Sequence, residues 1–157
     1  MKKIATTFIA TLLTMATLFG VNKTGTMAAK FLSINVGSRA VSMGGAYTAI
    51  AGDASAMYWN PAGLSYHQTR AVYFNHANWI ADIAFDYFGV TVPINSSQTL
   101  GLNITSVSMA DMEVTRYGNE DTGETFSAAD YAFGITYAIN ITDRFSIGFN
   151  GKYIQEI

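Results

Sequence analysis

The sequence contains no cysteine, only two histidines and few charged residues. Without cysteine, the 157-residue chain has no disulfide bond, no thiolate nucleophile and no zinc knuckle. Two histidines do not build a metal site of two or three imidazoles without several carboxylate ligands beside them. Nine lysines and arginines against eleven acidic residues give a net charge of −2, so the chain lacks the basic character expected of a nucleic-acid-binding protein.

Charged residues make up only 13% of the chain, whereas 50% of its residues are hydrophobic. Soluble globular domains contain about 25% charged residues. The high apolar content argues against a disordered chain, and the low charge argues against an ordinary cytosolic surface. We therefore expect part of the apolar side chains to face an environment other than water. The length allows at most one domain.

Residues 1–28 have the pattern of a secretory signal peptide. Lys2 and Lys3 are followed by an uncharged apolar stretch at 4–19, and small residues follow at Gly20 and Ala28. We expect cleavage between 20 and 28. The alternative is an N-terminal membrane anchor, but the apolar stretch barely reaches the ~17–20 residues that a spanning helix needs. Cleavage after residue 28 would remove three of the nine basic residues, leaving six against eleven acidic ones and a net charge of −5.

Alternation of apolar and small residues predicts five β-strands in the remainder of the chain. They are expected at 70–78, 80–94, 99–105, 131–142 and 145–153. In each of the clearest strands one face is large and apolar, while the other carries Gly, Ala, Ser, Thr and Asn with only Lys152 charged. A soluble β-sandwich would carry charges on its second face, so the pattern favours a barrel with an apolar outside and a small polar inside. A β-sandwich interaction domain stays the alternative.

The lengths of the connections fit the same fold. The turns at 95–98 and 140–144 are short and fall at one end, whereas the link at 110–127 is long and falls at the other, as in outer-membrane barrels. The acidic residues of the long link lack calcium-loop spacing and indicate a solvated surface loop. Because five strands are too few to close a barrel, we expect an all-β fold that is the N-terminal part of a longer transmembrane antiparallel barrel. An oligomeric barrel is the alternative.

Two sequence blocks precede the strands. The first contains Arg39, Met43, Gly44, Gly45 and Ala46, and the second contains Asn60, Pro61, Ala62, Gly63 and Leu64. The paired glycines predict positive φ angles or close backbone approach, and the Asn-Pro-Ala-Gly sequence predicts a turn. We expect Arg39 to form an ion pair inside the barrel with Asp53, Asp82 or Asp86, or else to be solvated.

These two blocks resemble the beginning of the PorV/PorQ family, which belongs to the FadL-like superfamily of outer-membrane barrels. The resemblance covers about residues 30–65, and it implies that the ten block residues are a structural family motif. It also implies a barrel of about fourteen strands in the outer membrane. We therefore divide this chain into a signal peptide at 1–28, a plug-like segment at 29–66 and the first barrel strands at 67–157.

The sequence offers no candidate residues for catalysis, cofactor binding or metal binding. His67 and His76 have no serine or cysteine partner that the periodicity would bring to them, and neither glycine-rich nucleotide-binding motif is present. The resemblance implies association with the type IX secretion system, with outer-membrane lipid, secreted cargo or secretion components as partners. A FadL-like passive transporter of fatty acids or other hydrophobic compounds is the alternative. The polar inward positions favour the secretion role, because a lipid transporter needs bulky apolar side chains in its lumen.

Overall fold

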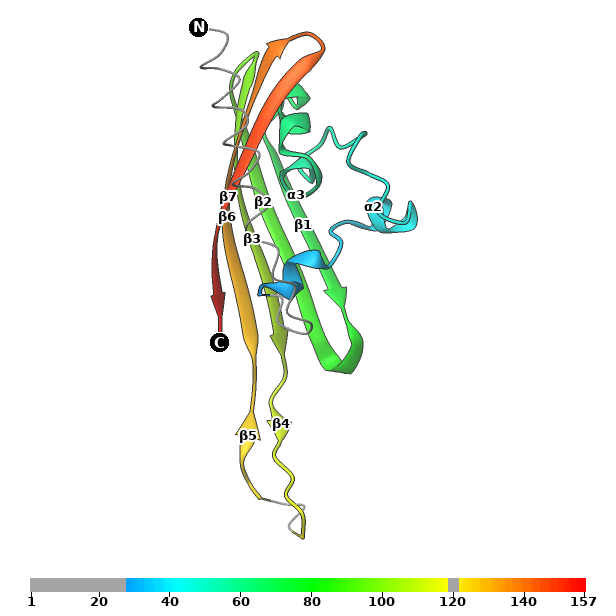
Figure 1. Cartoon of the computed structure of the whole chain (residues 1–157), viewed down its shortest axis with the longest axis vertical. Helices are drawn as coiled ribbons and strands as arrows, with labels where there is room; N and C mark the ends of the chain where they lie inside the picture. Colours follow the sequence, from blue (N-terminus) through cyan, green and yellow to red (C-terminus); the bar gives the residue numbers. More distant parts are fainter. Residues whose placement is uncertain (1–27, 119–121) are drawn as a thin grey trace, which may run out of the picture.

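The computed structural model describes residues 28–118 and 122–157, so the predicted signal peptide lies almost wholly outside the described residues. Five long antiparallel strands form one twisted sheet in the order β1-β2-β3-β6-β7 (Figure 1). These strands are β1 (Ala71–Asn78), β2 (Ile83–Asn95), β3 (Gln98–Met109), β6 (Ala129–Thr142) and β7 (Phe145–Glu156). A separate two-stranded sheet pairs β4 (Met112–Glu113) with β5 (Thr125–Phe126). Among the described residues, no helix is both long and apolar enough to cross a membrane.

All five predicted strands are present, and the all-β fold with an open antiparallel sheet is confirmed. The bounds of β1 and β6 differ from the prediction by one and two residues, and those of the other three strands differ by more. β2 begins at Ile83 because residues 80–82 form the short 3-10 helix η4 (Ile80–Asp82), in which Asp82 has a φ of 54°. β3 continues to Met109 and β7 to Glu156, since each keeps pairing with β6 beyond the residues whose alternation is clear.

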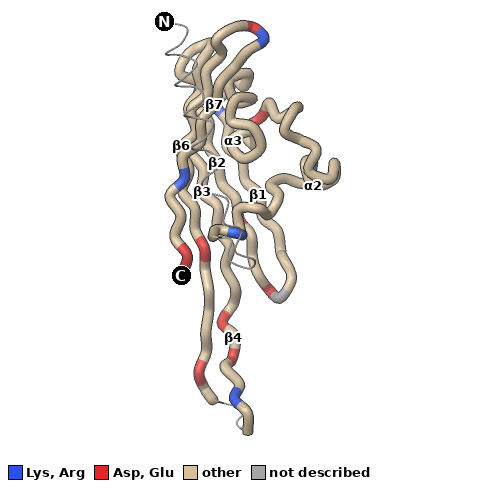
Figure 2. The backbone as a smooth tube through the Cα atoms, in the orientation of Figure 1, with Lys and Arg blue, Asp and Glu red and all other residues tan. Residues whose placement is uncertain are grey.

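Short and long connections lie at opposite ends of the sheet (Figure 1). The β2–β3 and β6–β7 turns share one end, and the long β3–β6 connection leaves from the other. This long connection is not a plain loop, because β4 and β5 pair in it and carry it well beyond the sheet. Charged residues gather on this extension and near the strand ends (Figure 2). Arg116 and Glu124 form an ion pair across it at 2.7 Å.

The chain before β1 folds against one face of the sheet (Figure 1). It contains four short helical elements: η2 (Lys30–Ser33), α2 (Ser38–Ser42), α3 (Ala56–Trp59) and η3 (Pro61–Tyr66). We call residues 29–66 the N-terminal segment. Its Met57 and Leu64 are fully buried together with Ala138 of β6. The main core of the described residues therefore lies between this segment and the sheet, not between two sheets.

Candidate functional site

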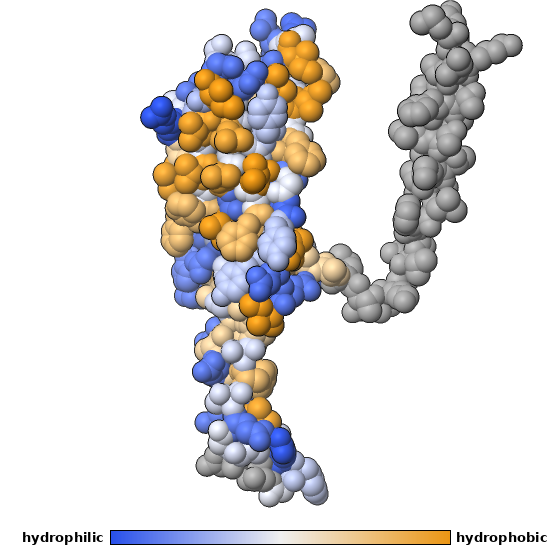
Figure 3. Space-filling view, turned by 90° about the vertical axis from the view of Figure 1, so that its left-hand side faces the viewer, coloured by the Kyte–Doolittle hydropathy of each residue, from blue (hydrophilic) through white to orange (hydrophobic). Residues whose placement is uncertain are grey.

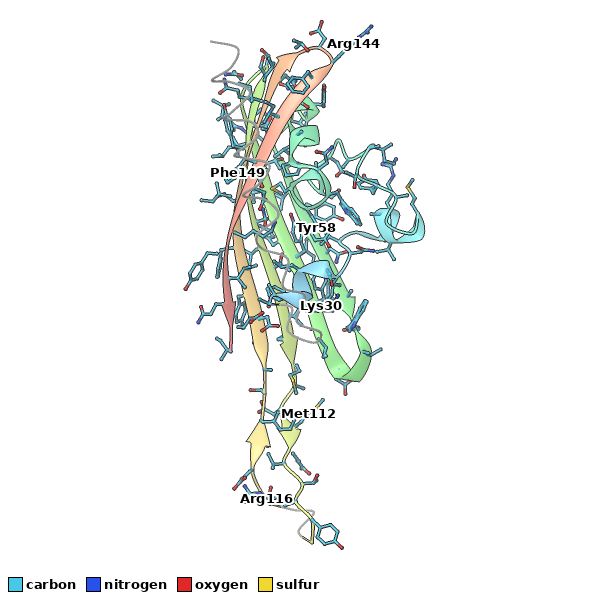
Figure 4. The ribbon with its side chains drawn as sticks, in the orientation of Figure 1. Lys30, Tyr58, Met112, Arg116, Arg144 and Phe149 are labelled. Atoms are coloured by element: carbon cyan, nitrogen blue, oxygen red, sulfur yellow. The ribbon has the colours of Figure 1, made fainter. Side chains whose placement is uncertain are left out.

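The two faces of the sheet differ sharply in side-chain size and polarity. On the outer face, away from the N-terminal segment, large apolar side chains are exposed; among them are Phe74 (66%), Leu102 (54%), Ile135 (60%) and Phe149 (69%). Phe149 points away from the N-terminal segment (Figure 4). Hydrophobic residues form a broad area on the face seen in Figure 3. An uncovered apolar surface of this extent is unusual for a water-facing protein and marks a contact with lipid or with another protein.

Strand register shows where this apolar surface ends. Along the hydrogen-bonding direction, one outer row runs through Phe74, Phe88, Ile104, Phe133 and Tyr153. The next outer row, toward the long connection, is polar and runs through His76, Asp86, Ser106, Tyr131 and Gln155. In this row His76 Nδ1 and Asp86 Oδ1 lie 2.7 Å apart, and His76 Nε2 is 3.2 Å from Asn78 Oδ1. The apolar surface is thus a band with a mostly aromatic border and a polar margin.

The inner face of the sheet is mostly small and polar over β3, β6 and β7, whereas β2 adds the large buried side chains Phe85 and Tyr87, which pack against Val36 of the N-terminal segment. The buried polar side chains of this face are Thr91, Thr99, Asn103, Thr105 and Thr136. Asn103 Nδ2 donates to Thr136 Oγ1 at 3.4 Å across the β3–β6 pair. These positions were expected to face the inside of a barrel, and in the structure the N-terminal segment packs against this face of the sheet.

Polar side chains of the sheet bind the backbone of this segment. Asn140 Nδ2 donates to the Ser65 carbonyl at 3.2 Å, and its Oδ1 accepts from Ser65 Oγ at 2.5 Å. On the neighbouring strand, Asn150 Nδ2 lies 3.2 Å from the Met57 carbonyl and 2.5 Å from Thr136 Oγ1. Buried backbone carbonyls need such partners, so asparagines on the inner face hold the segment in one position.

Glycines on the inner face allow the N-terminal segment to approach closely. A Cβ atom on Gly101 would lie 2.5 Å from Met57 Sδ and 3.2 Å from Leu64 Cδ2. A Cβ on Gly148 of β7 would overlap the backbone of Pro61 and Ala62. The small residues that the sequence places on this face therefore make room for the segment.

The first motif block forms a sharp turn. Gly44 and Gly45 have φ angles of 64° and 79°, as their expected conformational freedom requires. The exposed side chains of Met43 and Ala46 flank them. Arg39 is exposed, and its guanidinium carbon lies 5.6 Å from the centroid of the Tyr47 ring.

The expected ion pair of Arg39 is wrong for all three proposed partners within the described ranges. Asp53 instead accepts hydrogen bonds from the Tyr47 hydroxyl at 3.1 Å and from Ser55 Oγ at 2.5 Å. Asp86 is paired with His76 on the outer face, and Asp82 lies in η4. Arg39 therefore interacts with the aromatic face of Tyr47, consistent with a solvated guanidinium.

The second motif block starts η3 and lies against the sheet. Asn60 Nδ2 donates to the Thr48 carbonyl at 3.0 Å, which connects this block to the chain following the first block. Gly63 is buried where a Cβ would overlap the Ala51 carbonyl oxygen, and Leu64 is fully buried. The two motif blocks, separated by thirteen residues, are thus joined through residues 47–51.

An aromatic cluster that the sequence analysis missed connects the two blocks. Trp59 packs edge-on against Tyr47 and Tyr58, with centroid distances of 6.0 and 5.0 Å. Trp59 Nε1 donates to the Val36 carbonyl at 2.9 Å, and the Tyr58 hydroxyl lies 3.1 and 2.9 Å from the Leu32 and Ile34 carbonyls. The Met-Tyr-Trp-Asn-Pro sequence was the available signal, because two adjacent aromatic donors before a turn need acceptors when buried.

The Tyr58 ring packs edge-on against Tyr87 of β2 at a centroid distance of 6.3 Å, on the side of the sheet that η2 occupies. Burial raises the pKa of the Tyr58 phenol, since desolvation disfavours the charged phenolate. Tyr58 therefore stays a neutral donor over the whole physiological pH range. Within residues 28–118 and 122–157, three or more metal-ligating side chains do not come together anywhere.

The chain is an all-β protein whose sheet has an apolar outer face and an inner face covered by the N-terminal segment. The open five-stranded sheet is consistent with part of a β-barrel. The family model of the type IX secretion system protein PorV matches residues 20–156. The chain therefore belongs to the PorV family, as the motif resemblance implied, and this is a secretion-system family and not an enzyme family. Comparison with curated proteins found no match, and comparison with solved structures found none either.

Proposed function

We propose that this chain forms the first wall of an outer-membrane β-barrel that takes part in type IX secretion, with the N-terminal segment as an internal plug. The association with type IX secretion follows from the family. The outer-membrane location, the cleaved signal peptide and the barrel belong to the proposal. The observation that carries it is the apolar band on the outer face of the sheet.

The dimensions of the band support a lipid contact. On β6 the outer apolar side chains extend from Phe133 to Ile141, which are eight residue steps apart. At ~3.3 Å per residue this is roughly 26 Å along the strand, and a tilt of roughly 40° reduces it to roughly 20 Å along the membrane normal. Outer-membrane barrels have an apolar band about 25 Å tall with aromatic borders. The polar row through His76 and Asp86 fits the membrane surface beyond it.

The inner face supports a plugged barrel in preference to an open lipid conduit. Most inward residues of β3, β6 and β7 are threonine, asparagine, glycine and alanine, and Asn140 and Asn150 bind the N-terminal segment directly. A fatty-acid conduit would need bulky apolar side chains that line an open lumen, whereas the inward Phe85 and Tyr87 of β2 are buried against the N-terminal segment. The proposed partners are therefore outer-membrane lipid on the outside and secreted cargo or secretion components at the barrel ends.

The test combines location and secretion in one strain. The gene is deleted in its natural host and replaced by a tagged copy, and outer-membrane fractions are analysed by electrophoresis with and without boiling. We expect a heat-modifiable species in the outer membrane, loss of secreted type IX cargo on deletion, and recovery on complementation. A protein found only in soluble fractions, or normal cargo secretion in the deletion strain, would overturn the proposal.

A further inference from the structure

The inner-face ends of β6 and β7 carry two carboxylates side by side. Asp130 and Glu156 are register partners on adjacent strands, and strand alternation places both on the face that the N-terminal segment covers. Directly opposed like charges destabilise a strand pair. The two ion pairs found in the described ranges join other residues, so within those ranges neither carboxylate has a cationic side chain within 4.0 Å.

The backbone nitrogen of Ala29 approaches one of these carboxylates, that of Glu156. It donates to Glu156 Oε1 at 2.7 Å, although the two residues lie 127 positions apart in the sequence. As long as the chain continues to Ala28, this nitrogen is an uncharged amide. A free amino terminus at residue 29 would instead place a positive charge beside the acidic pair.

The backbone conformation of Ala29 also favours a free amino terminus at residue 29. Ala29 has a φ of 54° and a ψ of 40°, a left-handed conformation that costs a non-glycine residue roughly 1–2 kcal/mol. The φ angle involves the carbonyl carbon of the preceding residue, so an amino-terminal alanine has no such restriction. Hydrolysis before Ala29 would therefore remove the strain while creating the charge.

The sequence before Ala29 fits a signal peptidase site. Thr26 and Ala28 are small residues at the third and first positions before the bond, as the enzyme requires, and the apolar stretch at 4–19 precedes them. The sequence left the cleavage site open between residues 20 and 28. The contact and conformation of Ala29 favour cleavage after residue 28.

We propose that signal peptidase cleaves the Ala28–Ala29 peptide bond and that the new α-ammonium of Ala29 forms an ion pair with Glu156, which fastens the N-terminal segment to the end of β7. Water is the co-reactant: the C–N bond breaks, the hydroxyl goes to the Ala28 carbonyl carbon, and the Ala29 nitrogen takes a proton to become an amine that is protonated at neutral pH. This inference rests on the export that the proposed function requires.

The first measurement is the intact mass and N-terminal sequence of the protein recovered separately from the membrane and soluble fractions of cells expressing the full precursor. We expect a chain beginning at Ala29, and for Ala28→Leu an accumulated precursor that retains residues 1–28. A mature chain beginning at any other residue would overturn the cleavage site. A chain beginning at Ala29 but found only in soluble fractions would contradict the proposed function and leave this inference intact.

The second measurement tests the ion pair. An amine-reactive reagent labels the neutral amine but not the ammonium, so a carboxylate partner slows labelling of the α-amine at neutral pH. We expect Glu156→Gln to increase the labelling rate of the Ala29 amine about threefold or more. The matched control, Glu113→Gln in β4, should leave the rate unchanged. Equal rates in the wild type, Glu156→Gln and the control would overturn the ion pair.

Discussion

At Gly148 the backbone of the second motif block lies directly against the sheet, and a methyl group there would overlap Pro61 and Ala62. We therefore expect Gly148→Ala to push η3 away from β7 and to destabilise the folded protein by about 1–3 kcal/mol, the usual cost of overpacking. Urea unfolding in detergent micelles, followed by tryptophan fluorescence, measures this change because Trp59 lies in the N-terminal segment.

Gly151→Ala is the matched control for this substitution. It lies on the same strand, and an added Cβ there meets only the Phe149 ring, at 3.3 Å. We expect its free energy of unfolding to stay within about 0.5 kcal/mol of the wild type, as for most surface substitutions. If both variants are equally stable, η3 does not lie against β7 as the structure has it.

The hydroxyl of Tyr58 gives a prediction about pH. Its pKa is raised above the ordinary value of 10.0 by burial, and as a neutral phenol it donates to the carbonyls near η2. The stabilisation is therefore complete below the unfolded-state pKa and is lost as the pH rises through the higher folded-state pKa. We expect Tyr58→Phe to cost about 1 kcal/mol at neutral pH and less above about pH 10.

Unfolding midpoints of wild type and Tyr58→Phe, measured from neutral to alkaline pH, test this expectation. Tyr66→Phe is the control, because the Tyr66 side chain is 50% exposed. A stability difference between wild type and Tyr58→Phe that stays constant up to the highest pH would show that the phenol does not titrate with folding.

At the scale of elements, the apolar band on the outer face gives the sharpest distinction between lipid and water. Ile135 is 60% exposed in the middle of β6. In water, Ile135→Arg at such a position would be neutral or would improve solubility. In lipid, an arginine near the midplane costs about 2–4 kcal/mol. We expect Ile135→Arg to lower the amount of heat-modifiable protein in outer membranes severalfold.

Gln155→Arg is the control for the band, since Gln155 lies on the same outer face but in the polar row beyond the aromatic border. We expect it to assemble like the wild type. Normal assembly of Ile135→Arg would mean that another protein, or water, and not lipid, faces this part of β6.

The strands could be predicted from the sequence because the alternation of apolar and small side chains reflects the environments of the two faces. It can be recognised in one strand without knowing which strands pair with it. The sequence did not predict the pairing of β4 with β5, because two-residue strands such as Thr125–Phe126 are too short to show a period. The predicted ion pair of Arg39 was wrong for a different reason. Asp53 accepts three donors from Tyr47 and Ser55 instead, which is tertiary and local detail that residue types alone do not specify.

The ten motif residues show the same limit. The positive φ angles of Gly44 and Gly45 were expected, because few other residues adopt them. The approach of the two blocks was not, since it depends on Trp59, whose ring lies between Tyr47 and Tyr58. Sequence patterns therefore indicated the strands of the sheet better than the segment that covers it.

At the scale of the whole molecule, the question is whether the N-terminal segment stays on the sheet while the protein works. Asparagines on two strands hold its backbone, and its own Met57 and Leu64 are fully buried against the sheet. Such contacts are typical of a segment that stays packed in the protein core. We therefore expect secretion to proceed with the segment in place.

The absence of native cysteine allows this to be tested with a single engineered disulfide. Ser65 and Asn140 have side chains in contact, with Oγ and Oδ1 2.5 Å apart, so the double variant Ser65→Cys with Asn140→Cys should cross-link in the oxidising periplasm. The two single variants are the controls. We expect the cross-linked protein to secrete cargo at the same rate as these controls, because the bond joins parts that do not separate. A loss of secretion that a membrane-permeable reductant restores would instead show that the segment must leave the sheet.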